Sequence, residues 1–529
     1  MSGATPGERR LSERRGSDAG APSDYRSDVA VLALLALAKL LFHLATSQGY
    51  GIFRDELYYI ACSDHLALGY VDHPALSIAL LWLARHTLGD SLLAIRFLAG
   101  LAGAASVFVT GLIARELGGG RGAQVLAALA VFFAPVLMTF GHFFSMNVFD
   151  LLFWSILELL AVLILKGDRP RLWLVFGVVA GLGLNNKYSV GFLLFGLGVG
   201  LLISPQRRQL ATRWPWLAGG LAALIFLPHV WWEAQNGWPS VEFMARASAE
   251  KNLPISPLDF FLQQILLLSP LAFPLWFGGL CALLFAPSMR PVRALGWAYV
   301  AVFVLFVTQH AKVYYLAPIY PVVFAAGAVA LGHVAARRQW RWPLPVADAI
   351  IVAGGLIVLP LAVPVLPVET FLAYQDALGL TPPQMERNER GALPQVFADM
   401  FGWTEEVDTV ARVYAQLPAE QRARAVVLVR NYGEAGAINF LGKERALPRA
   451  ISGHNNYWLW GPGDLRDGDT VIALGPPREV LEQAFSEVER VDTVHCRYCI
   501  PFESELPVHV ARGFKVPLAE LWQRLKRFI

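Results

Sequence analysis

Two acidic clusters stand close together in the first polar stretch of the chain, between residues 48 and 90. Asp55 and Glu56 form the first cluster, and Asp72, followed by His73, belongs to the second. A carboxylate at the boundary between water and lipid can deprotonate an acceptor hydroxyl, while a second carboxylate orients the acceptor or holds a metal ion. The alternative interpretation is a solvated loop whose acids pair with neighbouring arginines. Position alone favours neither interpretation.

Two lysines lie in short polar turns between apolar segments. Lys187 is followed by Tyr188, and Lys312 is followed closely by Tyr314 and Tyr315. No acidic residue nearby in the sequence neutralises either lysine. Because ammonium groups complement phosphate oxygens, both lysines are suited to a phosphate bound at the membrane face. The alternative is that they reach lipid headgroups without any specific ligand.

A third polar turn contains His142 and Asn147, and Asp150 lies just inside the apolar segment that follows. Polar groups within a membrane are costly and usually face a cavity or a partner. His142 and Asn147 are candidates for substrate contact in this outer turn, whereas for Asp150 we favour a structural role at the start of a helix. Arg96 and Glu158 are also embedded in apolar segments, and we interpret them as contacts between helices.

The composition shows what kind of scaffold carries these residues. Of the 529 residues, 55% are hydrophobic and only 16% are charged, whereas about a quarter of a soluble domain is charged. The mean hydropathy is +0.46, which excludes a disordered chain and an ordinary cytosolic protein. The 44 basic and 41 acidic residues leave a net charge of only +3. No nucleic-acid partner is expected, since binding to a polyanion requires a basic surface.

Eleven apolar segments approach the length of a membrane-spanning helix, which is roughly 20 residues. The segment 75–88 is too short to cross, and we interpret it as an interfacial helix. The predicted spans are 29–47, 91–114, 123–141, 148–165, 172–186, 189–204, 214–232, 263–286, 294–308, 313–334 and 344–366.

Basic residues recur in every second turn between these spans and in the first 28 residues. Because cytoplasmic loops carry an excess of Lys and Arg, this pattern places the arm of residues 1–28, which we predict to be disordered, in the cytoplasm. An odd number of spans then puts the C-terminal tail on the outer side. The predicted parts are the arm, a membrane domain over 29–366 with its first outer loop at 48–90, and an outer soluble domain over 367–529.

The tail has the pattern of a small α/β domain. Buried apolar runs are typical of strands, and apolar residues three or four positions apart are typical of helices. We expect strands at 425–429, 470–474 and 508–511 and helices at 404–416 and 478–488.

Cys496 and Cys499 form a C-x-x-C motif in the same tail. This spacing occurs in redox pairs and in half of a zinc site. The second half of a closed zinc site is missing, so on the outer side of a membrane we favour a local disulfide.

Taken in order, these motifs resemble those of the GT-C superfamily of membrane glycosyltransferases. The resemblance covers residues 30–335 and is closest to the protein O-mannosyltransferase and aminoarabinose transferase branch, often described as dolichyl-phosphate-mannose–protein mannosyltransferase-like. The tail resembles the outer domain of bacterial members at 431–436 and 454–458. The motifs that carry the resemblance are Asp55-Glu56-Leu57-Tyr58-Tyr59, Asp72-His73-Pro74, the stretch 181–188 and Lys312-Val313-Tyr314-Tyr315-Leu316-Ala317-Pro318.

The resemblance implies a fold, a reaction and a set of residues. The implied fold is a polytopic α-helical membrane protein of the GT-C type, with a C-terminal soluble α/β domain. Such enzymes transfer a sugar from a polyprenyl-phosphate carrier to an acceptor on the outer face, with Asp55 here as the general base. No cofactor is required with certainty and no metal ligand is assigned, although a divalent metal is left open. The implied catalytic residues are Asp55 and Glu56, and the implied substrate-binding residues are Asp72, His73, Tyr59, His142, Asn147, Lys187, Tyr188, Lys312, Tyr314 and Tyr315.

The expected partners are a polyprenyl-phosphate sugar, a lipid, glycan or protein acceptor, and the bilayer. A composition rich in Ala, Arg, Leu and Gly favours a bacterial inner membrane. Two other classes of function stay open. The embedded charges of Arg96, Asp150 and Glu158 could line the pathway of a transporter or flippase, although the chain shows no repeated halves. An inactive GT-C relative that binds the lipid carrier without turnover would carry the same motifs.

Overall fold

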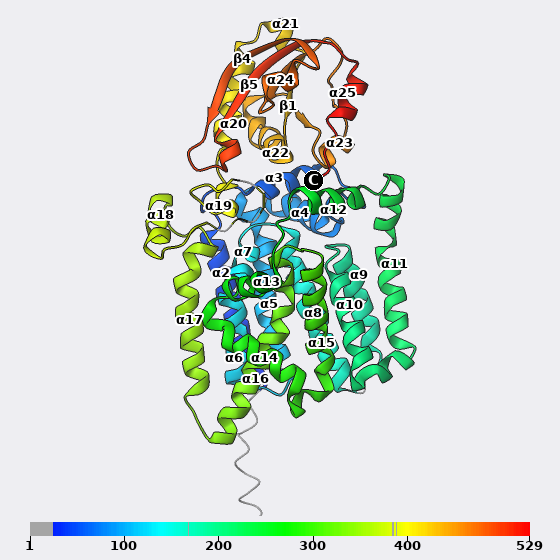
Figure 1. Cartoon of the computed structure of the whole chain (residues 1–529), viewed down its shortest axis with the longest axis vertical. Helices are drawn as coiled ribbons and strands as arrows, with labels where there is room; N and C mark the ends of the chain where they lie inside the picture. Colours follow the sequence, from blue (N-terminus) through cyan, green and yellow to red (C-terminus); the bar gives the residue numbers. More distant parts are fainter. Residues whose placement is uncertain (1–24, 168, 383, 385, 388) are drawn as a thin grey trace, which may run out of the picture.

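The computed structural model describes residues 25–167, 169–382, 384, 386–387 and 389–529. It shows a helical bundle with an α/β domain standing on one end (Figure 1). Within the described residues, seven helices are long and apolar enough to cross a membrane. They are α2 (Tyr25–Thr46), α5 (Leu92–Glu116), α8 (Met146–Lys166), α11 (Trp214–Gln235), η3 with α15 (Pro287–Thr308), η4 with α16 (Val313–Arg338) and α17 (Pro343–Ala362).

Three further apolar segments are bent pairs of helices, which raises the number of spans in the described residues to ten. The first pair bends by 65°, the second by 111° and the third by 97°. They are α6 (Arg121–Phe133) with α7 (Pro135–His142), α10 (Val190–Ile203) with η1 (Pro205–Ala211), and α13 (Pro257–Leu267) with η2 (Pro270–Ala272) and α14 (Phe273–Phe285).

Each of the eleven predicted spans coincides with a helix or a broken helix, but the predicted count exceeds the seven to ten that length supports. The segment predicted as one span at 172–186 is α9 (Leu172–Leu184), with only 13 residues. The span predicted at 263–286 is wrong as a single helix, since the chain breaks between α13 and α14. Ser269 has a φ of 76° there and Pro270 follows it, and a proline removes a backbone donor and disfavours helical geometry in the residue before it.

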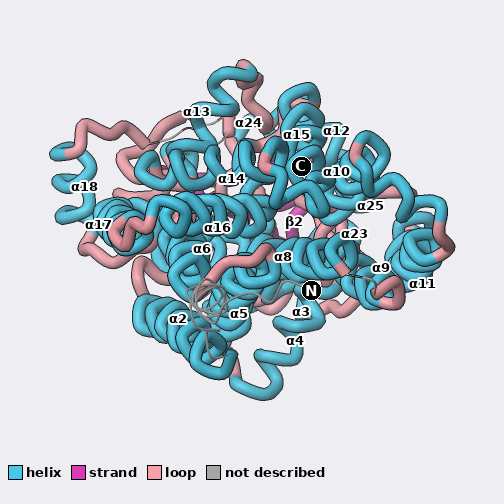
Figure 2. Tube along the Cα trace, turned by 90° about the horizontal axis from the view of Figure 1, so that it is seen from below, coloured by secondary structure: helices cyan, strands magenta, loops and turns pink. Residues whose placement is uncertain are grey.

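α16 lies in the middle of the bundle, in contact with α5, α6 and α14 (Figure 2). It approaches α14 closely through Gly279 and Gly327. A Cβ at either glycine would lie 2.0 or 2.1 Å from a backbone oxygen of the other helix, so only residues without a side chain permit this contact. α2 and α17 have only 17% of their apolar windows buried, as helices on the rim of a bundle do.

A layer of short helices separates the bundle from the soluble domain (Figure 1). It contains α3 (Arg54–Asp64), α4 (Leu76–Leu88) and α12 (Pro239–Glu250). α4 is the separate short helix expected at 75–88. Of the predicted arm 1–28, residues 1–24 lie outside the described residues, and 25–28 already belong to α2. After α17 the chain continues through α18 (Val368–Ala377) and α19 (Gln395–Ala398) into the soluble domain.

The described part of the soluble domain contains one five-stranded sheet with the order β2-β1-β3-β5-β4. β1 pairs in parallel with β2 and β3, whereas β5 pairs antiparallel with β3 and β4. The strands are β1 (Ala425–Val429), β2 (Ala450–Ser452), β3 (Thr470–Leu474), β4 (Phe485–His495) and β5 (Glu505–Phe514). The helices are α20 (Trp403–Gln416), α21 (Ala419–Arg422), α22 (Tyr432–Leu441), α23 (Asn456–Leu459), α24 (Arg478–Leu481) and α25 (Leu518–Arg524).

The strands expected at 425–429, 470–474 and 508–511 and the helix expected at 404–416 are confirmed. The helix expected at 478–488 is wrong, because α24 ends at Leu481 and the chain enters β4 at Phe485. Leu481, Phe485 and Val488 are all buried at helical spacing, but they belong to two different elements. The local disulfide between Cys496 and Cys499 is present.

Candidate active site

α3 begins at a buried turn that fixes the direction of Asp55. Oε2 of Glu56 accepts hydrogen bonds from the backbone N–H of Phe53 at 2.9 Å and from Nη2 of Arg96 at 2.7 Å. Oε1 accepts from Nε of Arg96 and from the backbone N–H of Phe144, both at 2.8 Å. These four bonds use the capacity of the carboxylate, which argues against the predicted catalytic role of Glu56. Its position suits an anchor for α3, and Arg96 makes the interhelix contact expected of it.

The soluble domain closes over α3 and supplies part of the site. The hydroxyl of Tyr432 donates to Oδ1 of Asp55 at 2.9 Å, and the Tyr432 ring stacks on Tyr58 with centroids 4.5 Å apart. Oδ1 of Asn456 accepts from the backbone N–H of Val71 at 2.7 Å. Asp55 is half-buried, and its Oδ2 is not hydrogen-bonded to any described residue. One carboxylate oxygen is thus held, and the other is left without a hydrogen bond in the described part of the chain.

The surroundings of Asp55 favour its neutral form more than water does. Burial is the main cause and raises the pKa of Asp55, and the negative charge of Asp72 raises it further. The hydrogen bond from Tyr432 and the positive charges of Arg54 and Lys251 lower this pKa. A carboxyl group with a raised pKa is a stronger base when ionised, as a proton acceptor in catalysis requires.

Asp72 and His73 differ in their access to the site. Oδ1 of Asp72 accepts from the Tyr58 hydroxyl at 2.9 Å, and the Asp72 side chain is 17% exposed. The His73 ring is fully buried, 5.0 Å from the Tyr59 ring, and its Nδ1 lies 2.9 Å from the carbonyl oxygen of Pro74, to which it donates. The rings of Tyr59 and His73 are thus buried beside each other, and the substrate-binding role predicted for both stays a prediction.

Lys187 lies in a cage of polar and aromatic groups. Its Nζ donates to Oδ1 of Asn147 at 2.7 Å and lies 3.7 Å from Oδ2 of Asp150. The Tyr315 ring centroid is 4.8 Å from the same Nζ, and that of Tyr314 is 6.0 Å away. The predicted substrate-binding residues Asn147, Lys187, Tyr314 and Tyr315 thus come together. Asp150 is the neutralising partner that the sequence near Lys187 does not reveal.

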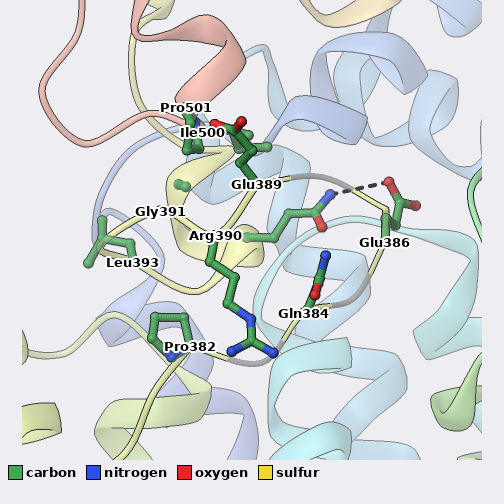
Figure 3. Close-up of a pocket in the computed structure, with 11 residues that line it drawn as sticks. Pro382, Gln384, Glu386, Glu389, Arg390, Gly391, Leu393, Ile500 and Pro501 are labelled. Atoms are coloured by element: carbon green, nitrogen blue, oxygen red, sulfur yellow. Dashed lines mark hydrogen bonds between the residues drawn. The ribbon is translucent and has the colours of Figure 1, made fainter. Parts of the chain in front are cut away.

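Two further cations face the carboxylates of the site. Nζ of Lys312 forms an ion pair with Oε1 of Glu386 at 2.6 Å, and Glu386 lies in a small pocket beside Gln384 (Figure 3). Nζ of Lys251 has no hydrogen-bond or ion-pair partner within the described ranges, although the charges of Asp55, Asp72, Glu386 and Lys312 all act on it. Burial lowers the pKa of Lys251, so an additional anion would stabilise its charged form.

Tyr188 and His142 both lie against residues of other helices. The Tyr188 hydroxyl is 2.6 Å from Nε2 of His229 and 2.8 Å from Oγ of Ser240, which ties α11 to α12. His142 is 1% exposed and its ring lies 6.4 Å from that of His43 inside the bundle. Both residues therefore contribute to packing between helices, and the substrate contact predicted for them stays a prediction.

Within the described residues, no three His, Cys, Asp or Glu side chains are grouped so that they could hold a metal ion. No metal ligand was assigned from the sequence, and the structure adds none in these ranges.

Comparisons with known proteins identify the architecture around this site. The family described as dolichyl-phosphate-mannose-protein mannosyltransferase matches residues 72–232. The lipid A galacturonosyltransferase RgtD of Rhizobium johnstonii is 28% identical over 460 residues, which cover 81% of this chain and 89% of that protein. The structure of ArnT from Cupriavidus metallidurans bound to undecaprenyl phosphate superposes with a TM-score of 0.60 at 15% identity, over 90% of this chain and 97% of that chain. Its apo structure gives a TM-score of 0.56 at 14% identity.

The chain is therefore similar in sequence to membrane glycosyltransferases and shares the fold of ArnT. This shared fold accounts for the helical bundle, the layer that carries α3 and the α/β domain on top.

Sequence reasoning missed three residues of this candidate site, namely Tyr432, Lys251 and Glu386. Tyr432 lies 377 positions from Asp55 in the sequence, and no local sequence pattern indicates a hydrogen bond between residues so far apart. The sequence contains one indication for Lys251. It lies in a predicted outer loop, where the positive-inside rule expects few lysines. Glu386 stands in a polar stretch with no periodicity, so only the fold relates it to Lys312.

With Asp55 as the general base, the pH dependence of turnover is expected to respond to Tyr432→Phe. Asp55 must be ionised to accept a proton, so activity falls as the pH drops through the pKa of Asp55. Loss of the Tyr432 hydroxyl removes a bond that lowers this pKa, so the acidic limb of kcat/KM moves to higher pH. Asp72→Asn removes a charge that raises the pKa and shifts the limb the opposite way. Profiles of kcat/KM against pH measure the direction of both shifts. Shifts of the acidic limb in the same direction in the two variants would contradict the assignment of this limb to Asp55.

Proposed function

We propose that the chain transfers a sugar from a polyprenyl-phosphate donor to an acceptor hydroxyl or amine, with Asp55 as the general base. One observation carries the proposal: the carboxylate of Asp55, one oxygen of which has no hydrogen bond within the described residues, lies within electrostatic reach of Lys251, where the bundle meets the soluble domain. Asp55 would take the proton of the acceptor as its oxygen or nitrogen attacks the anomeric carbon. The bond from that carbon to the phosphate oxygen breaks, and the phosphate leaves with the electron pair.

Lys251 and Lys312 are suited to the leaving phosphate. A developing negative charge is stabilised most by cations that are already in place and shielded from water. Lys251 has this character because it is half-buried and has no ion-pair partner in the described ranges, while Lys312 is held by Glu386. A phosphate is a sufficiently good leaving group to need no general acid.

The relatives support the choice of donor and acceptor class. ArnT from Cupriavidus metallidurans binds undecaprenyl phosphate, and RgtD is a lipid A galacturonosyltransferase. By analogy, we propose a polyprenyl-phosphate sugar as donor and a membrane glycolipid as acceptor, with a glycan or protein acceptor as the alternative. The positions of basic turns favour a bacterial inner membrane with the soluble domain on its outer side.

The test is sugar transfer from a panel of radiolabelled polyprenyl-phosphate sugars by the purified protein, with membrane lipids and cell-wall fractions as acceptors. Transfer of one labelled sugar identifies the donor and supports the proposal. Saturable binding of polyprenyl phosphate without transfer from any donor would contradict the enzyme and favour an inactive carrier-binding relative. Absence of both transfer and binding would contradict a carrier-dependent function altogether.

The lysine assignment has its own expected result. Lys251→Met is expected to weaken donor use about tenfold to a hundredfold in kcat/KM, since an interaction with a charged group contributes about 1.5–3 kcal/mol. The measurement is kcat/KM for the donor, with Lys443→Met, which changes a lysine on the soluble domain, as the charge-matched control. Equal losses of kcat/KM in both variants would indicate a general effect of the net charge and would contradict a local role for Lys251.

A further inference from the structure

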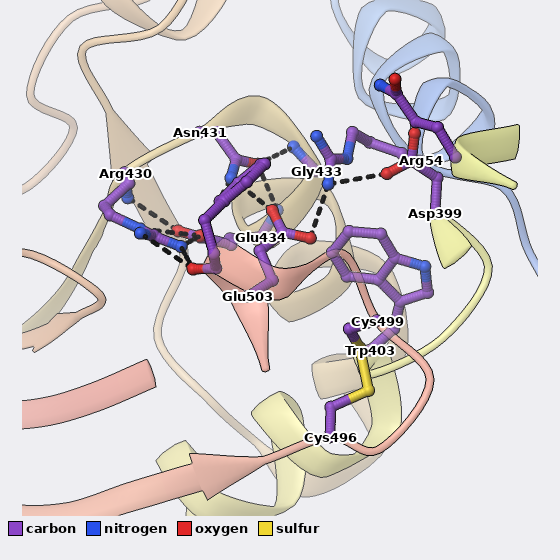
Figure 4. Close-up of polar contacts among 12 residues, drawn as sticks. Arg54, Asp399, Trp403, Arg430, Asn431, Gly433, Glu434, Cys496, Cys499 and Glu503 are labelled. Atoms are coloured by element: carbon purple, nitrogen blue, oxygen red, sulfur yellow. Dashed lines mark hydrogen bonds and ion pairs between the residues drawn. A yellow bond between two sulfur atoms is a disulfide. The ribbon is translucent and has the colours of Figure 1, made fainter. Parts of the chain in front are cut away.

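The loop 496–504 of the soluble domain reaches down to the start of α3 (Figure 4). It follows β4, contains the disulfide between Cys496 and Cys499, and ends in the short helix η6 (Pro501–Glu503). The backbone N–H of Cys496 donates to the carbonyl oxygen of Ser504 at 2.8 Å, which closes the loop at its base. Disulfide and hydrogen bond together limit the conformations available to Glu503.

Glu503 is a buried carboxylate whose two oxygens have different partners. Its Oε2 lies 2.5 Å from Nη2 of Arg54, the first residue of α3. Its Oε1 accepts from Nδ2 of Asn431 at 3.1 Å, and Asn431 caps the start of α22. Only 2% of the Glu503 side chain is exposed, so the ion pair with Arg54 is shielded from salt and water.

Arg54 is held by the soluble domain through both its main chain and its side chain. Its backbone N–H donates to the carbonyl oxygen of Asp399 at 3.0 Å, and its Nη2 lies 2.8 Å from Oδ1 of the same residue. Trp403, near the guanidinium, donates from Nε1 to the carbonyl oxygen of Ile52 at 3.1 Å. Three contacts from the soluble domain therefore fix the residues just before Asp55.

The disulfide packs directly on this arrangement. A Cβ at Gly402 would lie 2.6 Å from Sγ of Cys499 and 3.3 Å from Sγ of Cys496. Gly402 has a φ of 94° and immediately precedes Trp403. The sulfur atoms thus occupy the space beside the residue that begins α20, and their position is linked to that of Trp403.

We propose that Glu503 is a positioning residue for Asp55, and that the Cys496–Cys499 disulfide keeps Glu503 against Arg54. The inference rests on the proposed function for its kinetic consequence, because it concerns the placement of the base. Reduction by an added dithiol cleaves the sulfur–sulfur bond with two electrons and two protons and leaves two thiols. The loop then gains freedom, Arg54 loses a fixed partner, and the first turn of α3 is held less firmly. Misplacement of a reacting group by about 1 Å can cost about a hundredfold in rate.

The experiment compares the oxidised and dithiol-reduced full-length protein, with free thiols counted by mass. We expect kcat to fall about tenfold or more on reduction, with the donor KM little changed, and to return on reoxidation. Cys496→Ser with Cys499→Ser is expected to be slow already and insensitive to dithiol, which controls for Cys62 and Cys281. Glu503→Gln is expected to lower kcat in the same way, whereas Glu505→Gln, an exposed acid two residues later, is expected to leave it unchanged.

Hydrogen exchange at the backbone amides of 53–57 gives a second readout that does not depend on turnover. Faster exchange in the reduced protein and in Glu503→Gln supports the inference even where no donor has been found. Unchanged exchange, or full kcat with both thiols free, overturns it. If the oxidised protein transfers no sugar from any donor, the proposed function fails and exchange alone decides the inference. The reduced wild type and Glu503→Gln keep the test decisive should the double cysteine variant fail to fold.

Discussion

Asp55→Asn is expected to lower sugar transfer by about a thousandfold, within the range found for loss of a general base. Asparagine has nearly the same shape and can still accept the hydrogen bond from Tyr432, but it cannot take a proton from the acceptor. Binding of the polyprenyl phosphate is expected to persist, because the lysines are unchanged. Single-turnover transfer measures the first effect, and saturation binding of the carrier measures the second.

Asp64→Asn is the matched control for this experiment. Asp64 ends the same helix and pairs with Arg85 at 2.7 Å, far from the first turn of α3. It is expected to retain turnover within about twofold, as surface ion pairs contribute little. A rate for Asp55→Asn that matches this control would eliminate Asp55 as the base.

Glu56→Gln is expected to damage folding more than chemistry. The carboxylate of Glu56 is buried and pairs with the buried guanidinium of Arg96. Removing one partner of such a pair leaves an uncompensated charge and costs about 3–5 kcal/mol. The unfolding temperature and the yield of folded protein should fall, while turnover per folded molecule changes much less than in Asp55→Asn. Thermal unfolding in detergent and active-site-normalised rates give these two quantities.

A double replacement separates the ion pair from the reaction. Glu56→Leu with Arg96→Met removes both charges, and it is expected to be more stable than Arg96→Met alone, because no buried charge is left unpaired. Normal stability of Glu56→Gln together with a large loss of turnover would restore the catalytic role predicted from the sequence.

The sequence predicted the elements whose residues are uniformly buried or clearly amphipathic. β1 and β3 are buried along their whole length, so their apolar runs indicate strands without ambiguity. β4 was missed because its buried residues are widely spaced, with Phe485 and Val488 three positions apart and a bulge after Arg490. The break between α13 and α14 was missed because hydropathy averages over a window and does not register a change of direction.

The site could be predicted only as far as it is local. The positions of Asp55, Asp72, Lys187 and Lys312 between apolar segments made them candidates, and the structure brings them to one end of the bundle. Their partners come from distant parts of the chain, such as Glu386 for Lys312. Tertiary contacts of this kind produce no periodic pattern in the sequence. His73 was chosen from the motif that carries the resemblance and His142 from its polar turn, and the structure places both in buried positions.

The attachment of α3 to both the bundle and the soluble domain limits how such a protein can evolve. Arg96 of the bundle anchors one residue of its first turn, and Tyr432 of the soluble domain bonds the residue next to it. Neither part alone therefore positions the proposed base, and exchange of the soluble domain between relatives would replace only part of the candidate site. A chimera is expected to be active only when its soluble domain and its α3 come from the same relative. We therefore expect these two parts to be inherited together.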